Sequence, residues 1–229
     1  MRDPEFFLKK YDPVTSSMSF IDVDVDLVTC IKDMYERTYR LNKEWEFPWE
    51  VGKIHVPGIF INKLHSMLPL VFTRLTKELV SKTTSKWMMY TTNGTSGSNS
   101  CNKASNIAER YKGRVVSVVM VADVRGGQPG SVQFSVKDYS KSRDTFRILA
   151  AHKESRWEWD DHGEPFPWEE VEKYKEKKIK DRLTPEMLER YCKHLGIDLF
   201  NPDFYAGDAY IIESYTLPNS ICLDKYPNQ

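Results

Sequence analysis

Residues 114–123 read RVVSVVMVAD, the strongest strand pattern in the chain. β-Branched side chains favour extended backbone, and a run that is apolar at nearly every position is typical of a strand covered on both faces. The turn residues RGGQPG at 125–130 follow, and Val132, Phe134 and Val136 then alternate with polar residues. The pattern predicts a β-hairpin whose first strand forms the centre of a sheet.

Weaker patterns extend this prediction in both directions along the chain. Further strands are predicted at residues 20–26, 86–90, 145–150, 155–159 and 210–212. Helices are predicted at 27–41, 62–81, 167–182 and 184–196, and the Thr-, Ser-, Gly- and Asn-rich tract 91–102 is predicted to be a loop. These elements indicate an α+β fold, a largely antiparallel β-sheet with helices packed on one side, in which N- and C-terminal helices flank a strand-rich middle.

Two of the predicted helices carry capping signals. Thr184 followed by Pro185 is typical of an N-cap with proline in the first turn, and Gly196 can end that helix in the left-handed conformation. For the first helix, Asp24 or Asp26 is the expected N-cap.

Composition limits the kinds of partner. The 229 residues are 40% hydrophobic and 29% charged, which is ordinary for a globular chain, and 33 basic residues offset 33 acidic ones. With no net charge, no global field favours nucleic acid or an anionic membrane, and no segment has the ~20 apolar residues of a membrane span.

Four scattered cysteines with no metal-binding spacing indicate reduced thiols. We therefore expect an intracellular protein, cytoplasmic or nuclear, that does not bind membranes.

The ends of the chain bear on domain organisation. Residues 2–6, RDPEF, are also what two abutting cloning sites encode, so residues 1–6 are interpreted as a vector-derived remnant. Residues 7–229 are then expected to form a single α+β domain excised from a larger protein.

Aspartates suggest one possible chemistry. Asp22 and Asp24, two apart on a predicted strand, would point the same way and could share Mg²⁺ or Mn²⁺, with Asp123 at the end of another strand as a third ligand. The arrangement is similar to that of archaeo-eukaryotic primases, although the Ser-x-His element of that family is absent. The alternative interpretation is a solvated strand face.

The acidic stretch WEWDDHGE (157–164) is less specific. It carries four acids and a histidine after its first tryptophan, but their spacing matches no defined ligand loop. The sequence therefore predicts a polar hairpin tip or the approach to a helix there, and no metal site.

Tryptophans suggest a different function. Five of the six stand beside acids and prolines, which suits a groove for a peptide as well as loops pinned to the core: Trp45, Trp49, Trp157, Trp159 and Trp168.

Two function classes follow from these patterns. The leading hypothesis is a non-catalytic module, without cofactor, that binds a protein or peptide partner through the five tryptophans and neighbouring acids. The alternative is a metal-dependent transferase or nuclease acting on a nucleic acid, nucleotide or other phosphate-bearing substrate, with the three aspartates as ligands and the lysines of 173–182 as phosphate contacts. The sequence leaves open whether the protein is an enzyme.

Overall fold

A computed structural model describes residues 15–26, 28–30, 32–33, 36, 49–54, 58–65, 67, 75–93, 98–123, 129–141, 145–205 and 207–216. Its strands are β1 (Ser17–Asp22), β2 (Trp49–Ile54), β3 (Gly58–Ile59), β4 (Leu75–Lys82), β5 (Met88–Thr92), β6 (Arg114–Val121), β7 (Ser131–Asp138), β8 (Phe146–Lys153), β9 (Trp157–His162) and β10 (Asp208–Thr216). The α-helices are α2 (Phe60–His65), α3 (Ser98–Arg110) and α4 (Pro185–His194), and the 3₁₀ turns are η2 (Val171–Lys175), η3 (Ile179–Asp181) and η4 (Pro202–Tyr205).

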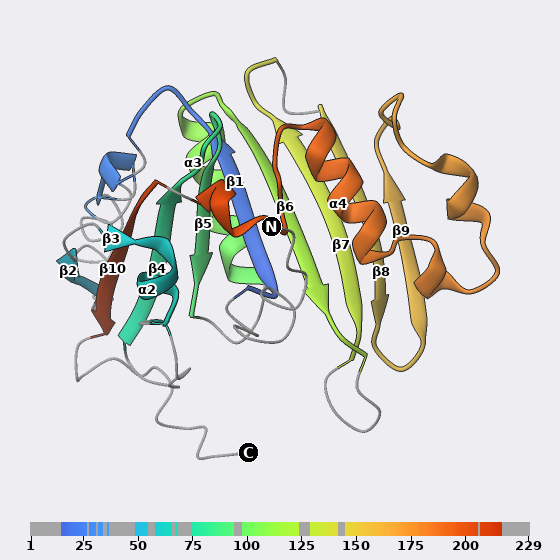
Figure 1. Ribbon diagram of the computed structural model, residues 1–229, viewed down its shortest axis with the longest axis horizontal. Helices are drawn as coiled ribbons and strands as arrows, with labels where there is room; N and C mark the ends of the chain where they lie inside the picture. The colour runs from blue at the N-terminus through green and yellow to red at the C-terminus, as the bar shows by residue number, and fades with distance from the viewer. Residues whose placement is uncertain are drawn as a thin grey trace.

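The strands form one sheet in the order β2-β10-β4-β5-β1-β6-β7-β8-β9, with β3 also paired to β10 (Figure 1). Every neighbouring pair is antiparallel. The described residues are thus an antiparallel sheet with a few short helices, in agreement with the coarse α+β prediction. Residues 1–6 lie outside the described residues, so their interpretation as a remnant stays a prediction.

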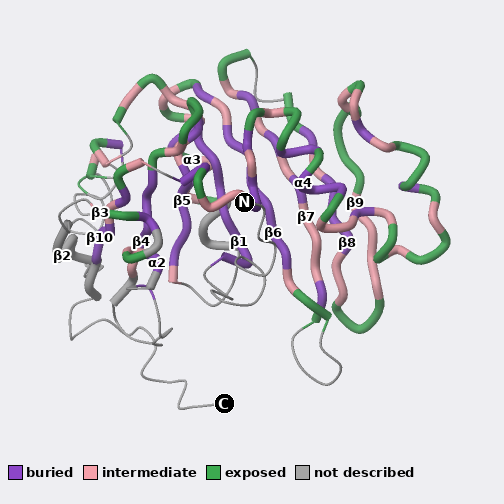
Figure 2. The backbone as a smooth tube through the Cα atoms, in the orientation of Figure 1, coloured by how far each residue is buried: buried purple, intermediate pink, exposed green. Residues whose placement is uncertain are grey.

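The predicted central hairpin is confirmed. β6 pairs with β7 from Arg114 opposite Asp138 to Val121 opposite Ser131, and β1 lies on its other side. All six inner residues of β6 are buried, as Figure 2 shows for the middle of the sheet. Val116, Val118 and Met120 belong to the core cluster on one face and Val115 to the cluster on the other, which is why the run is almost continuously apolar.

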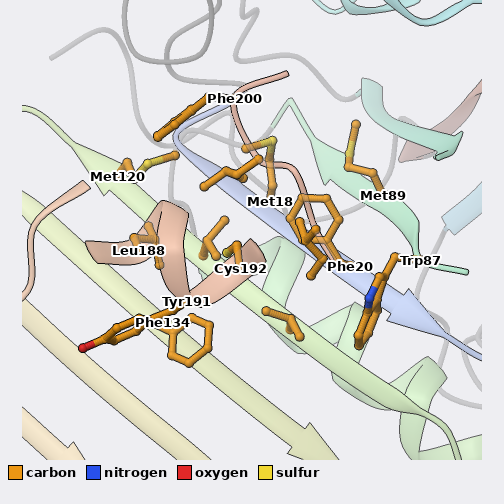
Figure 3. Close-up of a cluster of buried hydrophobic side chains, with 14 of the residues drawn as sticks. Met18, Phe20, Trp87, Met89, Met120, Phe134, Leu188, Tyr191, Cys192 and Phe200 are labelled. Carbon is orange, nitrogen blue, oxygen red and sulfur yellow. The ribbon is translucent and has the colours of Figure 1, made fainter. Parts of the chain in front are cut away.

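Helices pack on both faces of the sheet, so the predicted one-sided arrangement is wrong. Met18 and Phe20 of β1 belong to a core cluster that includes Leu188 and Cys192 of α4 (Figure 3), whereas Ile21 belongs to a second cluster with Ile107 of α3. Successive residues of a strand point to opposite faces, so α3 and α4 cover opposite sides, as Figure 1 shows. The physical reason is that β1 and β6 carry apolar residues toward both sides, Phe20 and Val116 toward α4 and Ile21 and Val115 toward α3, so each face needs cover.

Two predicted elements in the first half differ from the structure. The helix predicted at 62–81 is instead α2 followed by β4, and Leu79 and Val80 are buried on opposite faces of that strand between β10 and β5. The loop predicted at 91–102 contains the end of β5 and the start of α3. The α3 residues described in the core are Ala104, Ile107 and Ala108, which follow the polar tract, and this explains why the start of the helix was missed.

The last third contains one correct helix and one wrong one. The helix predicted at 167–182 is replaced by η2 and η3, separated by the non-helical residues 176–178. α4 begins and ends as predicted, because Thr184 Oγ1 accepts the Met187 N–H at 3.3 Å and Gly196 has φ +79°.

Asp26 also caps as predicted, since its carboxylate accepts the Thr29 N–H at 3.0 Å. Of the described helices, none is both long and apolar enough to cross a membrane.

Candidate functional site

Asp22 is the last residue of β1 and is held by two cations. It accepts hydrogen bonds from Lys86 Nζ at 2.7 Å and from Arg114 Nη2 at 2.8 Å. Partial burial opposes ionisation, but the hydrogen bonds and charges of Lys86 and Arg114 outweigh it and hold the pKa of Asp22 below its ordinary value. The cationic partners thus occupy the carboxylate that was predicted to bind a metal.

The other two aspartates lie elsewhere. Asp24 is exposed and lies beyond the end of β1, so it does not share a strand face with Asp22. Asp123 follows the far end of β6 and pairs with Lys153 Nζ at 2.9 Å. Because Asp22 is opposite Arg114 at the start of β6, about 25–30 Å of strand separates it from Asp123. The structure does not bring the three carboxylates together.

The predicted tryptophan surface is also divided. Trp45 lies outside the described residues, and Trp49 opens β2 at one end of the strand order, whereas Trp157 and Trp159 lie on β9 at the other. Eight strand spacings separate β2 from β9, or about 38 Å at ~4.8 Å each. Trp49 and the β9 tryptophans cannot form one continuous surface.

Trp159 and Trp168 are largely packing residues. Trp168 stacks between Phe166 and His194, with ring centroids 4.7 and 5.1 Å away. Trp159 lies 5.3 Å from the Tyr174 ring and 6.0 Å from the Arg182 guanidinium. Both side chains are half-buried against the core on the α4 side. They fix the segment after β9 to the sheet, and a partner could reach only their exposed parts.

A buried ionic group was missed by sequence reasoning. Arg147 of β8 is 1% exposed. Its Nε and Nη2 atoms donate to the buried Glu169 carboxylate at 2.9 and 2.7 Å. Its Nη1 atom donates to Asp161 at 2.5 Å. Burial lowers the pKa of Arg147, but these carboxylates outweigh it and raise the pKa overall. The signal in the sequence was an arginine in phase with Leu149 and Ala151, which face the core.

Two tyrosines complete this group. Tyr174 donates to Glu169 Oε2 at 2.8 Å, its hydroxyl lies 2.9 Å from that of Tyr191, and Tyr191 accepts the Glu170 N–H at 2.9 Å. Burial, followed by these neighbours, raises the pKa of Tyr174. All members have partners, so the group rigidly joins β8, η2 and α4.

Two tryptophans and several acidic and histidine side chains lie on β9 and the neighbouring strand β8. Trp157 and Trp159 face the α4 side, opposite Lys153 and Ala151 of β8. By strand alternation Glu158, Asp160 and His162 face the other side, where His152 of β8 is opposite Glu158. These acids and histidines are half-buried or exposed (Figure 2).

The outer edge of β9 ends the strand order, and no described strand pairs with it. We call this edge and the side chains of Trp157, Glu158, Trp159 and Asp160 the β9 surface.

Comparison of the chain with protein-family models, curated protein sequences and solved structures found no match. Any assignment therefore rests on the residues themselves.

One open depression of about 440 Å³ lies beside α4. Its charged walls are mostly paired with one another, Glu170 with Arg190 and Lys173 with Glu176. Each of these four side chains therefore already has an oppositely charged partner within the protein.

Proposed function

We propose that this chain is a non-catalytic protein-binding module that takes an extended, basic segment of a partner along the outer edge of β9. One observation carries the proposal. β9 presents acids on one face of the sheet and tryptophans on the other, and only a segment lying beside the edge reaches both. The proposal keeps the expectation that the module works inside the cell as part of a larger protein.

An added strand satisfies this geometry. Its backbone groups would pair with the outer edge of β9, and its side chains would alternate between the two faces. Residues on one face would meet Glu158 and Asp160, and residues on the other would meet the exposed parts of Trp157 and Trp159. The partner segment is therefore expected to alternate basic and apolar residues.

The charge distribution supports a basic partner. Glu158 and Asp160 lie on the α3 side, whereas the lysine-rich segment 173–182 lies on the α4 side, where Ile179 packs against the core. Among the described residues, the charged neighbour of Glu158 is Arg156, which lies 3.7 Å away and is 84% exposed, so a partner cation can replace this weak surface pair. Asp160 lies beside the imidazoles of His152 and His162. The same acids discourage pairing of β9 with β9 of a second copy, because like charges would lie side by side.

A binding titration tests the proposal. The probe is a fluorescent peptide of alternating lysine and valine, measured by anisotropy at low salt with EDTA present. Glu158→Lys should weaken binding about fivefold or more, because it places a like charge beside the peptide lysines. The matched control is Glu172→Lys, since Glu172 is 82% exposed and belongs to the segment on the α4 side.

Two results would overturn the proposal: equal affinity of the Glu158→Lys and Glu172→Lys variants for the lysine peptide, or equally tight binding of a peptide of alternating glutamate and valine.

A further inference from the structure

A carboxylate lies between two histidines on the α3 side of β8 and β9. Asp160 Oδ2 is 3.5 Å from His152 Nδ1, and Asp160 Oδ1 is 4.0 Å from His162 Nε2. In the strand register His152 is opposite Glu158 and His162 is opposite Ile148, so the backbones of the two histidines are about 13 Å apart along the strands. The imidazoles therefore approach Asp160 from opposite ends, one toward each oxygen.

His152 also faces the other acid of the β9 surface. Directly opposite residues of antiparallel strands have Cβ atoms about 4.5–5.5 Å apart, so His152 and Glu158 are cross-strand neighbours. On β7, the charged residue that faces the α3 side is Lys137, which is opposite Phe146 and so lies past the His162 end of the cluster. The helix on this side, α3, packs mainly on β1, β5 and β6. The described neighbours of the two acids are thus the histidines and Arg156, which lies 3.7 Å from Glu158.

The net charge of this group depends on the histidines. With neutral imidazoles, Glu158, Asp160 and Arg156 together carry one net negative charge. With both imidazoles protonated, the five side chains carry one net positive charge. Histidine ordinarily gains its proton between about pH 8 and pH 5, whereas carboxylates and lysines ordinarily keep their charges in that range. A change of pH there reverses the sign of the charge that a basic partner would meet.

The ring nitrogens are placed to occupy the carboxylate when they are protonated. His152 Nδ1 is buried and has no hydrogen-bond partner in the described part of the chain, although Asp160 Oδ2 lies 3.5 Å away. An imidazolium carries a proton on both nitrogens, so protonation puts an N–H opposite this oxygen. His162 is the last residue of β9 and its side chain is 60% exposed, so its ring can turn toward Asp160 Oδ1. A partner lysine would then have to displace both imidazoles.

We infer that His152 and His162 make the β9 surface pH-dependent, so that a basic segment is held when the imidazoles are neutral and released when they are protonated. The inference rests on the proposed function, because it concerns binding to the same Glu158 and Asp160. Release on acidification follows from differential affinity: a cationic ligand that binds the neutral form more tightly is bound less as that form becomes rarer.

Anisotropy titration of the lysine-valine peptide at about pH 8 and about pH 5.5, at low salt with EDTA, tests this regulation. We expect the parent to lose about threefold or more in affinity on acidification, a size typical of exposed charge pairs. The double variant His152→Gln/His162→Gln should bind like the parent at the higher pH and keep that affinity, within about 1.5-fold, at the lower pH. The matched control is His194→Gln, a histidine of α4 on the other side of the sheet, which should show the same loss as the parent. Circular dichroism at both pH values confirms that each variant is folded.

The outcomes separate this regulation from the proposed function. If the folded parent does not bind the peptide at the higher pH, the proposed function is overturned and its regulation with it. If the parent binds the peptide equally well at both pH values, the regulation alone is overturned. An equal loss of affinity in the parent and in the double variant also overturns the regulation, because the pH dependence would then come from other groups.

Discussion

Arg147 and Glu169 are buried against each other, with Nη2 and Oε2 2.7 Å apart, although one lies on β8 and the other in the segment that follows β9. Neither side chain is more than 1% exposed. Their pairing fixes the path of the chain between β9 and α4, and therefore what is left accessible at the β9 edge.

Glu169→Ala should destabilise the protein by about 3–5 kcal/mol, because it leaves the Arg147 guanidinium buried without its principal counter-charge. Urea unfolding at pH 7 measures the change. Glu172→Ala is the control, since its ion pair with Lys175 is exposed, and it should change stability by less than about 1 kcal/mol. Similar losses in the two variants would contradict the structural role of Arg147.

Tyr191→Phe removes a hydroxyl that accepts the Glu170 N–H and meets the Tyr174 hydroxyl. Loss of these buried hydrogen bonds should cost about 1–3 kcal/mol in chemical denaturation. Because the two tyrosines share a hydrogen bond, the double variant Tyr174→Phe/Tyr191→Phe should lose less than the sum of the single variants. Strict additivity would show that the hydroxyls act separately.

Gly163→Ala tests the turn that leads out of β9. Gly163 has φ +84°, and an added Cβ would lie 2.0 Å from the backbone oxygen of Phe146. We expect a loss above about 2 kcal/mol. Gly196→Ala is a close control, because its φ of +79° is similar but nothing lies within 4 Å of an added Cβ, so only the conformational cost of about 1 kcal/mol remains. Equal melting temperatures for the two variants would contradict the close approach of Gly163 to β8.

Asp22 should contribute a pH-dependent part of the stability. Its pKa in the folded state lies below the ordinary 3.8, so its ion pairs stabilise the fold above about pH 4 and are lost as the pH falls through the folded-state pKa. Asp22→Asn should therefore be less stable than the parent by roughly 1 kcal/mol at pH 7, and the difference should shrink toward pH 2. Denaturation curves at several pH values measure it; a difference that grows on acidification would reverse the assigned direction.

Local patterns predicted those elements whose signals lie within a few neighbouring residues. β6 follows from a run of β-branched residues. α4 follows from Thr184, which caps its first turn, from Pro185 in that turn, and from Gly196, whose positive φ ends the helix. In β4 the same kind of reasoning failed, because Leu79 and Val80 are buried by β10 and β5, which come from distant parts of the chain.

The candidate sites depended still more on tertiary structure. Spacing alone put Asp22 and Asp24 on one strand, but β1 ends at Asp22, where Lys86 and Arg114 hold it. The β9 surface needed the strand order, which leaves the outer edge of β9 without a described partner strand, and the register that puts its acids and tryptophans on opposite faces.

The sequence by itself determined that this chain builds a sheet around residues 114–121 and ends α4 near Gly196, because backbone preference and capping act over short distances. Only the tertiary structure decided which strands are edges, which face each acid occupies and which charges are buried together. Those outcomes depend on strand order and register, which are set by burying both faces of the sheet at once.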